Sequence, residues 1–214
     1  MFIPPTRRAF AAAGISLGFG LAGVRPAFAT VTDPDTMSIG AANAPLQLEE
    51  YASAACSHCA HFHATNWAQL KRDYIDTGRL RLTLKEILTE PAAIAFAMFQ
   101  LARCNTTSGA EYFRRLGILF ERQHTILTSG TVGAAVAILV STGGEWGLTE
   151  AQVMASFNDR AGQERITRSI NAANALGINS TPTFVLNGER IGAEFHTTEG
   201  MTRILDAALE RYGY

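Results

Sequence analysis

The chain has 214 residues, of which 47% are hydrophobic, and its formal net charge at pH 7 is −1. This length accommodates one ordinary domain, or one domain with a sizeable insertion, and the composition suits a packed core. The sequence has no basic stripe with interleaved aromatic residues, which argues against nucleic-acid binding. We therefore expect a folded globular chain without a nucleic-acid partner.

The first 29 residues have the pattern of an export signal. Arg7 and Arg8 precede an apolar run over 11–24, and Ala27-Phe28-Ala29 is a small-residue cleavage motif, so cleavage is expected after Ala29. The run is shorter than the about 20 apolar residues of a membrane-spanning helix. The paired arginines favour the twin-arginine route, with the general secretory route as the alternative. Either route predicts export, to a periplasm, where disulfides persist.

The first predicted strand covers residues 46–51, after an irregular stretch at 30–45 that is rich in Asp, Pro, Asn and Gly. Strand alternation puts Leu46, Leu48 and Glu50 on one face, so Glu50 points into the core if the leucines do. A carboxylate on an apolar face is an exception that suggests a proton acceptor or donor. In the alternative interpretation the strand frays at its end and Glu50 is solvated.

Cys56-Ser57-His58-Cys59 follows this strand, where a helix is predicted to start and to run to about residue 76. Unpaired N–H groups and the positive end of the helix dipole would favour a thiolate at Cys56, which makes it the candidate nucleophile. Cys59 lies one turn later and can attack a mixed disulfide formed at Cys56. His58 can add positive charge or a hydrogen bond to the thiolate.

The remaining elements predict an α/β fold with a helical insertion. A strand at 79–87 completes a βαβ unit with parallel strands. The turn Asn187-Gly188 joins two antiparallel strands, and an amphipathic helix covers 198–211. The stretch between the βαβ unit and this hairpin contains only helical patterns, at 92–103, 111–123, 132–141, 150–158 and 163–176.

A metal-binding module is the alternative from another functional class. Cys56, Cys59, His61 and His63 lie within eight residues, and thiolate and imidazole suit zinc or copper. On one helix these four positions do not converge on a single point, and no second cluster completes a site. We therefore expect no metal, with His61 and His63 on the helix surface or facing a groove. His124 and His196 carry no motif and are expected to be structural.

With the dithiol, the element order and Thr181-Pro182 in place, the sequence resembles the DsbA family of thioredoxin-fold disulfide oxidoreductases. The densest match is residues 48–59, and further matches lie at 101–104 and 180–188. The resemblance is greatest to exported bacterial members with a helical domain inserted in the fold. It implies a thioredoxin-like domain formed by residues 30–90 and 163–214, a central mixed sheet flanked by helices, and a helical insertion domain at 91–162.

The resemblance also implies roles for the residues around the dithiol. Cys56 matches the nucleophilic cysteine of the family and Cys59 the resolving one. His58 matches the histidine that stabilises the thiolate, and Glu50 matches the buried acid, which favours its proton-transfer role. Lys85, on the next strand, is a candidate neighbour of Glu50.

Two further residues match the substrate-binding part of the family site. Pro182 matches a cis-proline opposite the dithiol. That bond would present the backbone of Thr181 to an extended substrate chain in β-like pairing, and Thr181 itself matches a position that tunes the redox properties. The resemblance implies no cofactor other than the redox-active Cys56–Cys59 disulfide.

The family further implies the direction of transfer and the partners. A monomeric periplasmic oxidase would introduce disulfide bonds into reduced exported proteins, and a DsbB-like membrane quinone reductase would reoxidise it. A disulfide reductase or isomerase of the same fold is the alternative. Relatives can carry a second cysteine that pairs with the one matching Cys104, but this chain has three cysteines in total. Cys104 is therefore expected to be a buried inert thiol or, in the alternative, a reactive or dimer-forming one.

Overall fold

The computed structural model describes Met1 and residues 35–213, so the predicted export signal and its cleavage site lie outside the described residues. Its centre is a five-stranded sheet in the order β1-β3-β2-β4-β5. Strands β2 and β3 are parallel and the other neighbours are antiparallel. This confirms the predicted central mixed sheet, whose strands are β1 (Met37–Ile39), β2 (Leu46–Ala52), β3 (Leu80–Glu86), β4 (Thr183–Leu186) and β5 (Glu189–Arg190).

Strand β1 lies in the stretch that the sequence predicted to be irregular, and that prediction is wrong. Met37–Ile39 pairs antiparallel with β3, and the hydroxyls of Ser38 and Thr83 are 2.8 Å apart. Three residues are too few to display strand alternation. The strand forms because the edge of β3 offers unpaired backbone groups, which a local pattern cannot reveal.

The helices follow the predicted order, and four of them come between β3 and α6. Two begin earlier than predicted because polar side chains cap them: Ser108 accepts from the N–H of Glu111 at the start of α3, and Asp159 accepts from the N–H groups of Ala161 and Gly162 at the start of α6. The helices are α1 (Ser57–Leu70), the π-helical turn η1 (Lys71–Ile75), α2 (Ala92–Arg103), α3 (Gly109–Leu127), α4 (Val132–Glu145), α5 (Glu150–Phe157), α6 (Arg160–Ala175), the 3₁₀ turn η2 (Ala193–His196) and α7 (Thr198–Arg211).

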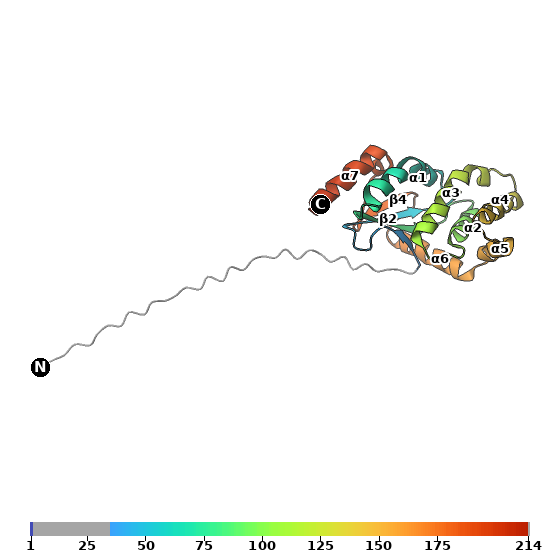
Figure 1. The fold of residues 1–214 in the computed structure, drawn as a ribbon, viewed down its shortest axis with the longest axis horizontal. Coiled ribbons are helices and arrows are strands. Elements are labelled where there is room, and N and C mark those ends of the chain that lie inside the picture. Colours follow the sequence, from blue (N-terminus) through green and yellow to red (C-terminus); the bar gives the residue numbers. More distant parts are fainter. Residues whose placement is uncertain (2–34, 214) are drawn as a thin grey trace.

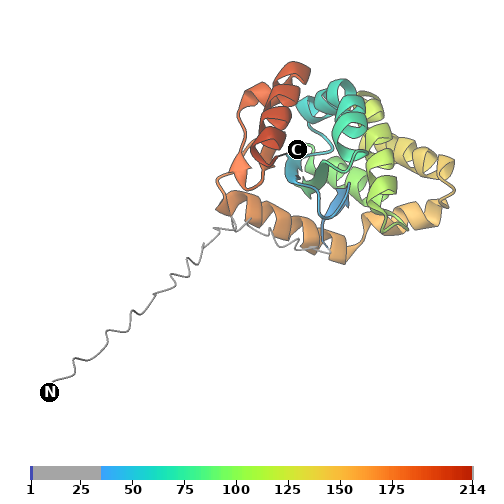
Figure 2. The same cartoon turned by 60° about the vertical axis from the view of Figure 1, so that its left-hand side comes forward.

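Helices cover both faces of the sheet. In Figures 1 and 2, α1 and α7 lie together on one side, α6 crosses the other, and α2 to α5 gather at the end of the molecule away from α7. The main core lies beneath α1 and α7, where the even-numbered leucines of β2 and β3 pack. A smaller core under α6 consists of Tyr51, Ile87, Ala173, Ile178 and Val185. In the part of the chain that the structure describes, no helix is long and apolar enough to cross a membrane.

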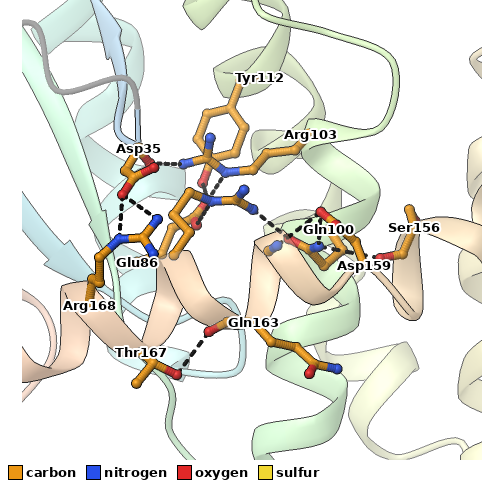
Figure 3. Close-up of polar contacts among 12 residues, drawn as sticks. Asp35, Glu86, Gln100, Arg103, Tyr112, Ser156, Asp159, Gln163, Thr167 and Arg168 are labelled. Carbon is orange, nitrogen blue, oxygen red and sulfur yellow. Dashed lines mark hydrogen bonds and ion pairs between the residues drawn. The ribbon is translucent and has the colours of Figure 1, made fainter.

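A buried carboxylate at the end of β3 joins the sheet to the helical part (Figure 3). Glu86 accepts hydrogen bonds from Arg103 Nε and from the hydroxyl of Tyr112, both at 2.7 Å. Arg165 of α6 lies 3.7 Å from its second oxygen. Removing one member of such a buried pair typically costs about 3–5 kcal/mol. Glu86 therefore ties β3 to α2, α3 and α6.

The start of α3 is packed so closely that it accepts only glycine. A Cβ atom at Gly109 would lie 1.7 Å from the carbonyl oxygen of Ser38 in β1, whereas one at Gly117 in the same helix would meet nothing within 4 Å. Gly109→Ala should lower the free energy of unfolding by about 1–3 kcal/mol, as overpacking does. Gly117→Ala is the matched control and should raise it by about 0.5–1 kcal/mol. Urea titrations of both variants test this, and equal effects would contradict the packing argument.

Candidate active site

Cys56 is the N-cap residue of α1. Its backbone is extended, and its sulfur accepts a hydrogen bond from the N–H of Cys59 at 3.3 Å. The sequence predicted that the helix starts at Cys56, and the structure starts it at Ser57. The N-cap position directs the sulfur at the unpaired N–H groups and the positive end of the helix dipole.

Several hydrogen bonds favour the thiolate of Cys56. They lower its pKa from 9.0 to about 5, the largest contribution being a hydrogen bond from Cys59, and burial opposes the shift. Thr181 and the backbone N–H groups of Cys59 and His58 contribute further to the lower pKa. His58 therefore acts on the thiolate through its backbone N–H. The residue itself is exposed to solvent. The largest part of the stabilisation comes from the side chain of Cys59, and peptide N–H groups add to it.

Cys59 has the opposite environment. It is fully buried, and burial raises its pKa well above the ordinary range, with further contributions from the hydrogen bond to Cys56 and from the charge of Glu50. Both cysteines, like Cys104, are free thiols in this structure. The site therefore gives two identical groups opposite environments, one that favours the thiolate and one that favours the thiol.

The loop before β4 lies against the nucleophile. The Thr181–Pro182 peptide bond is cis, as the resemblance implies. The Cys56 thiol donates to the carbonyl oxygen of Thr181 at 3.4 Å. A hollow of about 240 Å³ adjoins Thr181, and its apolar lining includes Ile87 and Ile178. An extended chain lying along this loop would have its backbone beside Thr181 and a side chain near the hollow.

Glu50 points inward from β2, as strand alternation predicted. It is fully buried, and its two carboxylate oxygens lie 3.0 and 3.1 Å from Nε2 of His63. Lys85 does not neighbour it. The register pairs Lys85 with Tyr51, so Lys85 points to the other face and its ammonium lies 3.2 Å from Glu49.

The expectation that His63 lies on the helix surface or in a groove is wrong. His63 is 8% exposed, and its ring packs between Trp67, at a centroid distance of 5.5 Å, and Phe120, at 4.7 Å. Phe120 belongs to α3, far away in the sequence, so the sequence could not show this packing. The available signal was helical spacing, since His63 falls among the buried positions Phe62, Asn66 and Leu70.

The histidines near the dithiol do not converge on a metal site. His61 is exposed, and His63 is bonded to Glu50. Within residues 35–213, no group of three or more His, Cys, Asp or Glu side chains is arranged to hold a metal ion. His124 is exposed, and the half-buried ring of His196 packs edge-on against Phe184 at 5.6 Å.

Gln123 is a site residue that sequence reasoning missed. It projects from α3, and its side-chain amide donates to the carbonyl oxygens of Ala54, at 2.7 Å, and Cys56, at 3.0 Å. The buried hydroxyl of Ser53 supports the same loop by accepting from the N–H of Ala55. The only sequence signal for Gln123 was a polar residue in the apolar stripe of a helix. The helical part thus holds the loop that carries the nucleophile.

Cys104 lies apart from the dithiol, at the end of α2. It is 8% exposed, burial raises its pKa, and its thiol donates to the carbonyl oxygen of Gln152 at 3.7 Å. It lines a cleft of about 710 Å³ together with Arg103 and Arg165. This environment disfavours the thiolate, as expected for an inert thiol.

The hydrogen bonds to Cys56 lead to a prediction about its reactivity. In a Cys104→Ser background, the rate of alkylation of the reduced protein by iodoacetamide should be half-maximal near pH 5, because the thiolate is the reactive form. Cys56→Ser should remove this reaction, since Cys59 is buried and protonated. A midpoint near the ordinary value of 9.0 would contradict the proposed stabilisation.

Comparisons with known proteins agree with this geometry. The relatives include a Rickettsia typhi protein that carries the name protein-disulfide oxidoreductase, 26% identical over 179 residues. The match covers 83% of this chain and 63% of the relative, so this chain spans less than two thirds of that protein.

Solved structures share the fold. Wolbachia pipientis alpha-DsbA1 superposes with a TM-score of 0.74 at 21% identity, covering 83% of this chain and 92% of that one. Chlamydia trachomatis DsbA gives a TM-score of 0.69 at 18% identity, covering 83% and 93%. The family model described as thioredoxin matches residues 32–207, nearly the whole described chain. With its dithiol at the start of α1 and its cis-proline loop opposite, the chain belongs to the thioredoxin family.

Proposed function

We propose that the protein is a thiol:disulfide oxidoreductase of the DsbA type, with Cys56 as the nucleophile. The observation that carries this proposal is the opposite effect of the site on its two thiols. It lowers the pKa of Cys56 to about 5 and raises that of the buried Cys59. The name of the Rickettsia relative and the shared fold support the same reaction.

The reaction is thiol–disulfide exchange. A substrate thiolate attacks Cys56 in the Cys56–Cys59 disulfide, a substrate–Cys56 bond forms, and Cys59 leaves with the electron pair and takes up a proton. A second substrate thiolate then attacks the substrate sulfur and releases Cys56 as a thiolate. The substrate leaves oxidised by two electrons and the protein is reduced by two. No cofactor beyond this disulfide takes part.

The direction of exchange depends on which redox form the site stabilises. The folded site favours the Cys56 thiolate, which exists only in the reduced protein, because the pKa of Cys56 falls from 9.0 to about 5. This stabilisation is complete above the ordinary pKa and is lost as the pH falls through about 5. Stabilising the reduced form makes the disulfide a stronger oxidant. We therefore favour an oxidase over a reductase or isomerase.

The substrates and partners are those that the family resemblance and the predicted export signal imply. We propose that the chain works as a monomer in the periplasm and introduces disulfide bonds into reduced exported proteins. An extended substrate segment would pair with the backbone of Thr181, next to Pro182, and direct a neighbouring side chain toward the hollow beside Thr181. A DsbB-like membrane quinone reductase would restore the disulfide.

Cysteine variants test the exchange reaction. With Cys104 replaced by serine, Cys59→Ala should accumulate mixed disulfides between Cys56 and reduced, unfolded proteins, because the resolving thiol is absent. Cys56→Ala should form none and should lack activity. Non-reducing electrophoresis and mass spectrometry of the adducts give the readout. Full activity in both variants would overturn the proposed function.

The reduction potential of the Cys56/Cys59 pair tests the direction of transfer. Equilibration of the Cys104→Ser protein in glutathione buffers should give a potential well above that of glutathione, because the thiolate of the reduced form is stabilised. Cys59→Ser, which cannot form the internal disulfide, is the control for glutathione adducts. A potential well below that of glutathione would identify a reductase, and the search for a partner would turn to an electron donor.

A further inference from the structure

Glu50 and His63 form one closed unit beside Cys59. The Glu50 side chain is fully buried and that of His63 is 6% exposed, with both carboxylate oxygens within 3.1 Å of Nε2. In the described part of the chain, His63 is the only side chain hydrogen-bonded to Glu50. Among the described side chains, this imidazole is therefore the hydrogen-bonding partner on which the charge of Glu50 depends.

The surroundings of the unit are almost entirely apolar. Leu84 from β3 and Phe184 from β4 are the register partners of Glu50, and Phe120 from α3 packs on His63. Titratable groups that lie near the unit include Cys59, on which the charge of Glu50 acts, and, beyond Phe184, His196 of η2. Lys85 and Glu49 neutralise each other on the opposite face of the sheet. No lysine or arginine of the described chain pairs with Glu50.

This isolation limits the protonation states that the unit can adopt. An uncompensated carboxylate in an apolar interior is costly, so a buried acid is neutralised or paired. With one exchangeable proton the unit is neutral, as imidazolium and carboxylate or as imidazole and carboxylic acid. Without that proton it carries one negative charge, stabilised by the Nε2–H bond from neutral His63. Glu50 and His63 should therefore gain and lose a proton together.

Thiol–disulfide exchange needs such a proton at Cys59. Cys59 leaves as a thiolate when a substrate attacks Cys56, and its buried position favours the thiol. In the opposite direction, Cys59 must lose its proton before it attacks a mixed disulfide at Cys56. Cys59 and His63 lie four residues apart on α1, hence on the same face of the helix, and both are buried. Glu50, which is bonded to His63, also acts on Cys59 through its charge. The unit therefore lies where this proton is needed.

We propose that His63 is the positioning residue that enables Glu50 to exchange a proton with Cys59, and this rests on the proposed exchange function. When substrate attacks Cys56, the Cys56–Cys59 bond breaks and its electron pair goes to Cys59. The sulfur of Cys59 then takes the proton of the Glu50–His63 unit, which passes from neutral to one negative charge. When Cys59 attacks a mixed disulfide, the proton returns to the unit and the new Cys56–Cys59 bond releases the other thiolate.

The test measures separately the formation of a mixed disulfide, which needs only Cys56, and its disappearance, which needs Cys59. Reduced Cys104→Ser protein is mixed with glutathione disulfide and quenched in acid at intervals, and the species are resolved by mass spectrometry. The mixed disulfide forms by attack of Cys56 and disappears by attack of Cys59. His63→Gln retains an N–H donor but cannot become a cation.

We expect His63→Gln to slow the disappearance of the mixed disulfide by about 10-fold or more at neutral pH. This is less than the about 10²–10⁴-fold of a complete general acid–base contribution, because the Glu50 carboxylate remains. It should also shift the pH profile of that step, because the exchangeable proton is then held by Glu50 alone. The formation of the mixed disulfide should change by less than about twofold, because Cys56 does not depend on this proton. A His63→Gln variant with the wild-type rate and pH profile for the second step would overturn the proposal, as would equal slowing of both steps.

Three further variants distinguish proton transfer from packing. Lys85→Gln breaks the ion pair on the opposite face and should match wild type in both steps. His63→Phe fills the space between Trp67 and Phe120 but cannot carry a proton. If this variant lost the mixed disulfide at the wild-type rate, His63 would contribute only packing, and the proposal would be overturned. Glu50→Gln should slow the second step as much as the double variant with His63→Gln, because the two residues act as a unit. Additive slowing would contradict the unit. If His63→Gln folds poorly, Glu50→Gln alone keeps the proposal testable, since it should slow the second step and leave the first unchanged.

The proposed function and this inference fail in different ways. If the wild-type protein forms no mixed disulfide at Cys56, the exchange function itself fails and the role of His63 falls with it. If wild type completes both steps and the His63 variants do so at the same rates, the exchange function stands and only the inference about His63 is wrong.

Discussion

The chemistry of the site depends on the unequal burial of two cysteines one helical turn apart. Cys56 caps α1, where peptide N–H groups and the helix dipole stabilise negative charge. Cys59 faces the core beside the carboxylate of Glu50, where a second negative charge is disfavoured. The fold thereby favours the thiolate at Cys56 and the thiol at Cys59 through environment alone. The cis-proline loop lies against Cys56, whose thiol donates to the carbonyl oxygen of Thr181.

The helices inserted between β3 and α6 belong to the site as well as to the scaffold. Gln123 of α3 holds the loop before α1 through two carbonyl oxygens, and Phe120 of the same helix packs on the ring of His63. At the other end of α3, Gly109 lies against β1, and Tyr112 bonds to Glu86 in β3. One helix therefore links the sheet, the loop of the nucleophile and the buried acid. A change in the packing of α3 would therefore alter the contacts of the sheet, of this loop and of the buried acid.

Two buried carboxylates on the same face of the sheet, those of Glu86 and Glu50, have different partners. Glu86 is surrounded by Arg103, Arg165 and Tyr112, so permanent cations fix its charge. Among the described residues, Glu50 is hydrogen-bonded to His63 and has no arginine or lysine partner. The arginine-bound acid suits a structural tie between strands and helices. The histidine-bound acid suits the proton exchange with Cys59 that we propose.

The sequence by itself determined the parts that depend on local patterns. Alternation in β2 placed Glu50 inward, helical periodicity located the helices, and the dithiol at the start of α1 indicated its chemistry, because short-range spacing decides each of these. Only the tertiary structure decided which groups meet. Strand β1 depends on the edge of β3, and the pairing of Lys85 with Glu49 depends on the register of β2 with β3. The burial of His63 and the bonds of Gln123 depend on the docking of α3. These contacts join residues far apart in the chain, so no local pattern contains them.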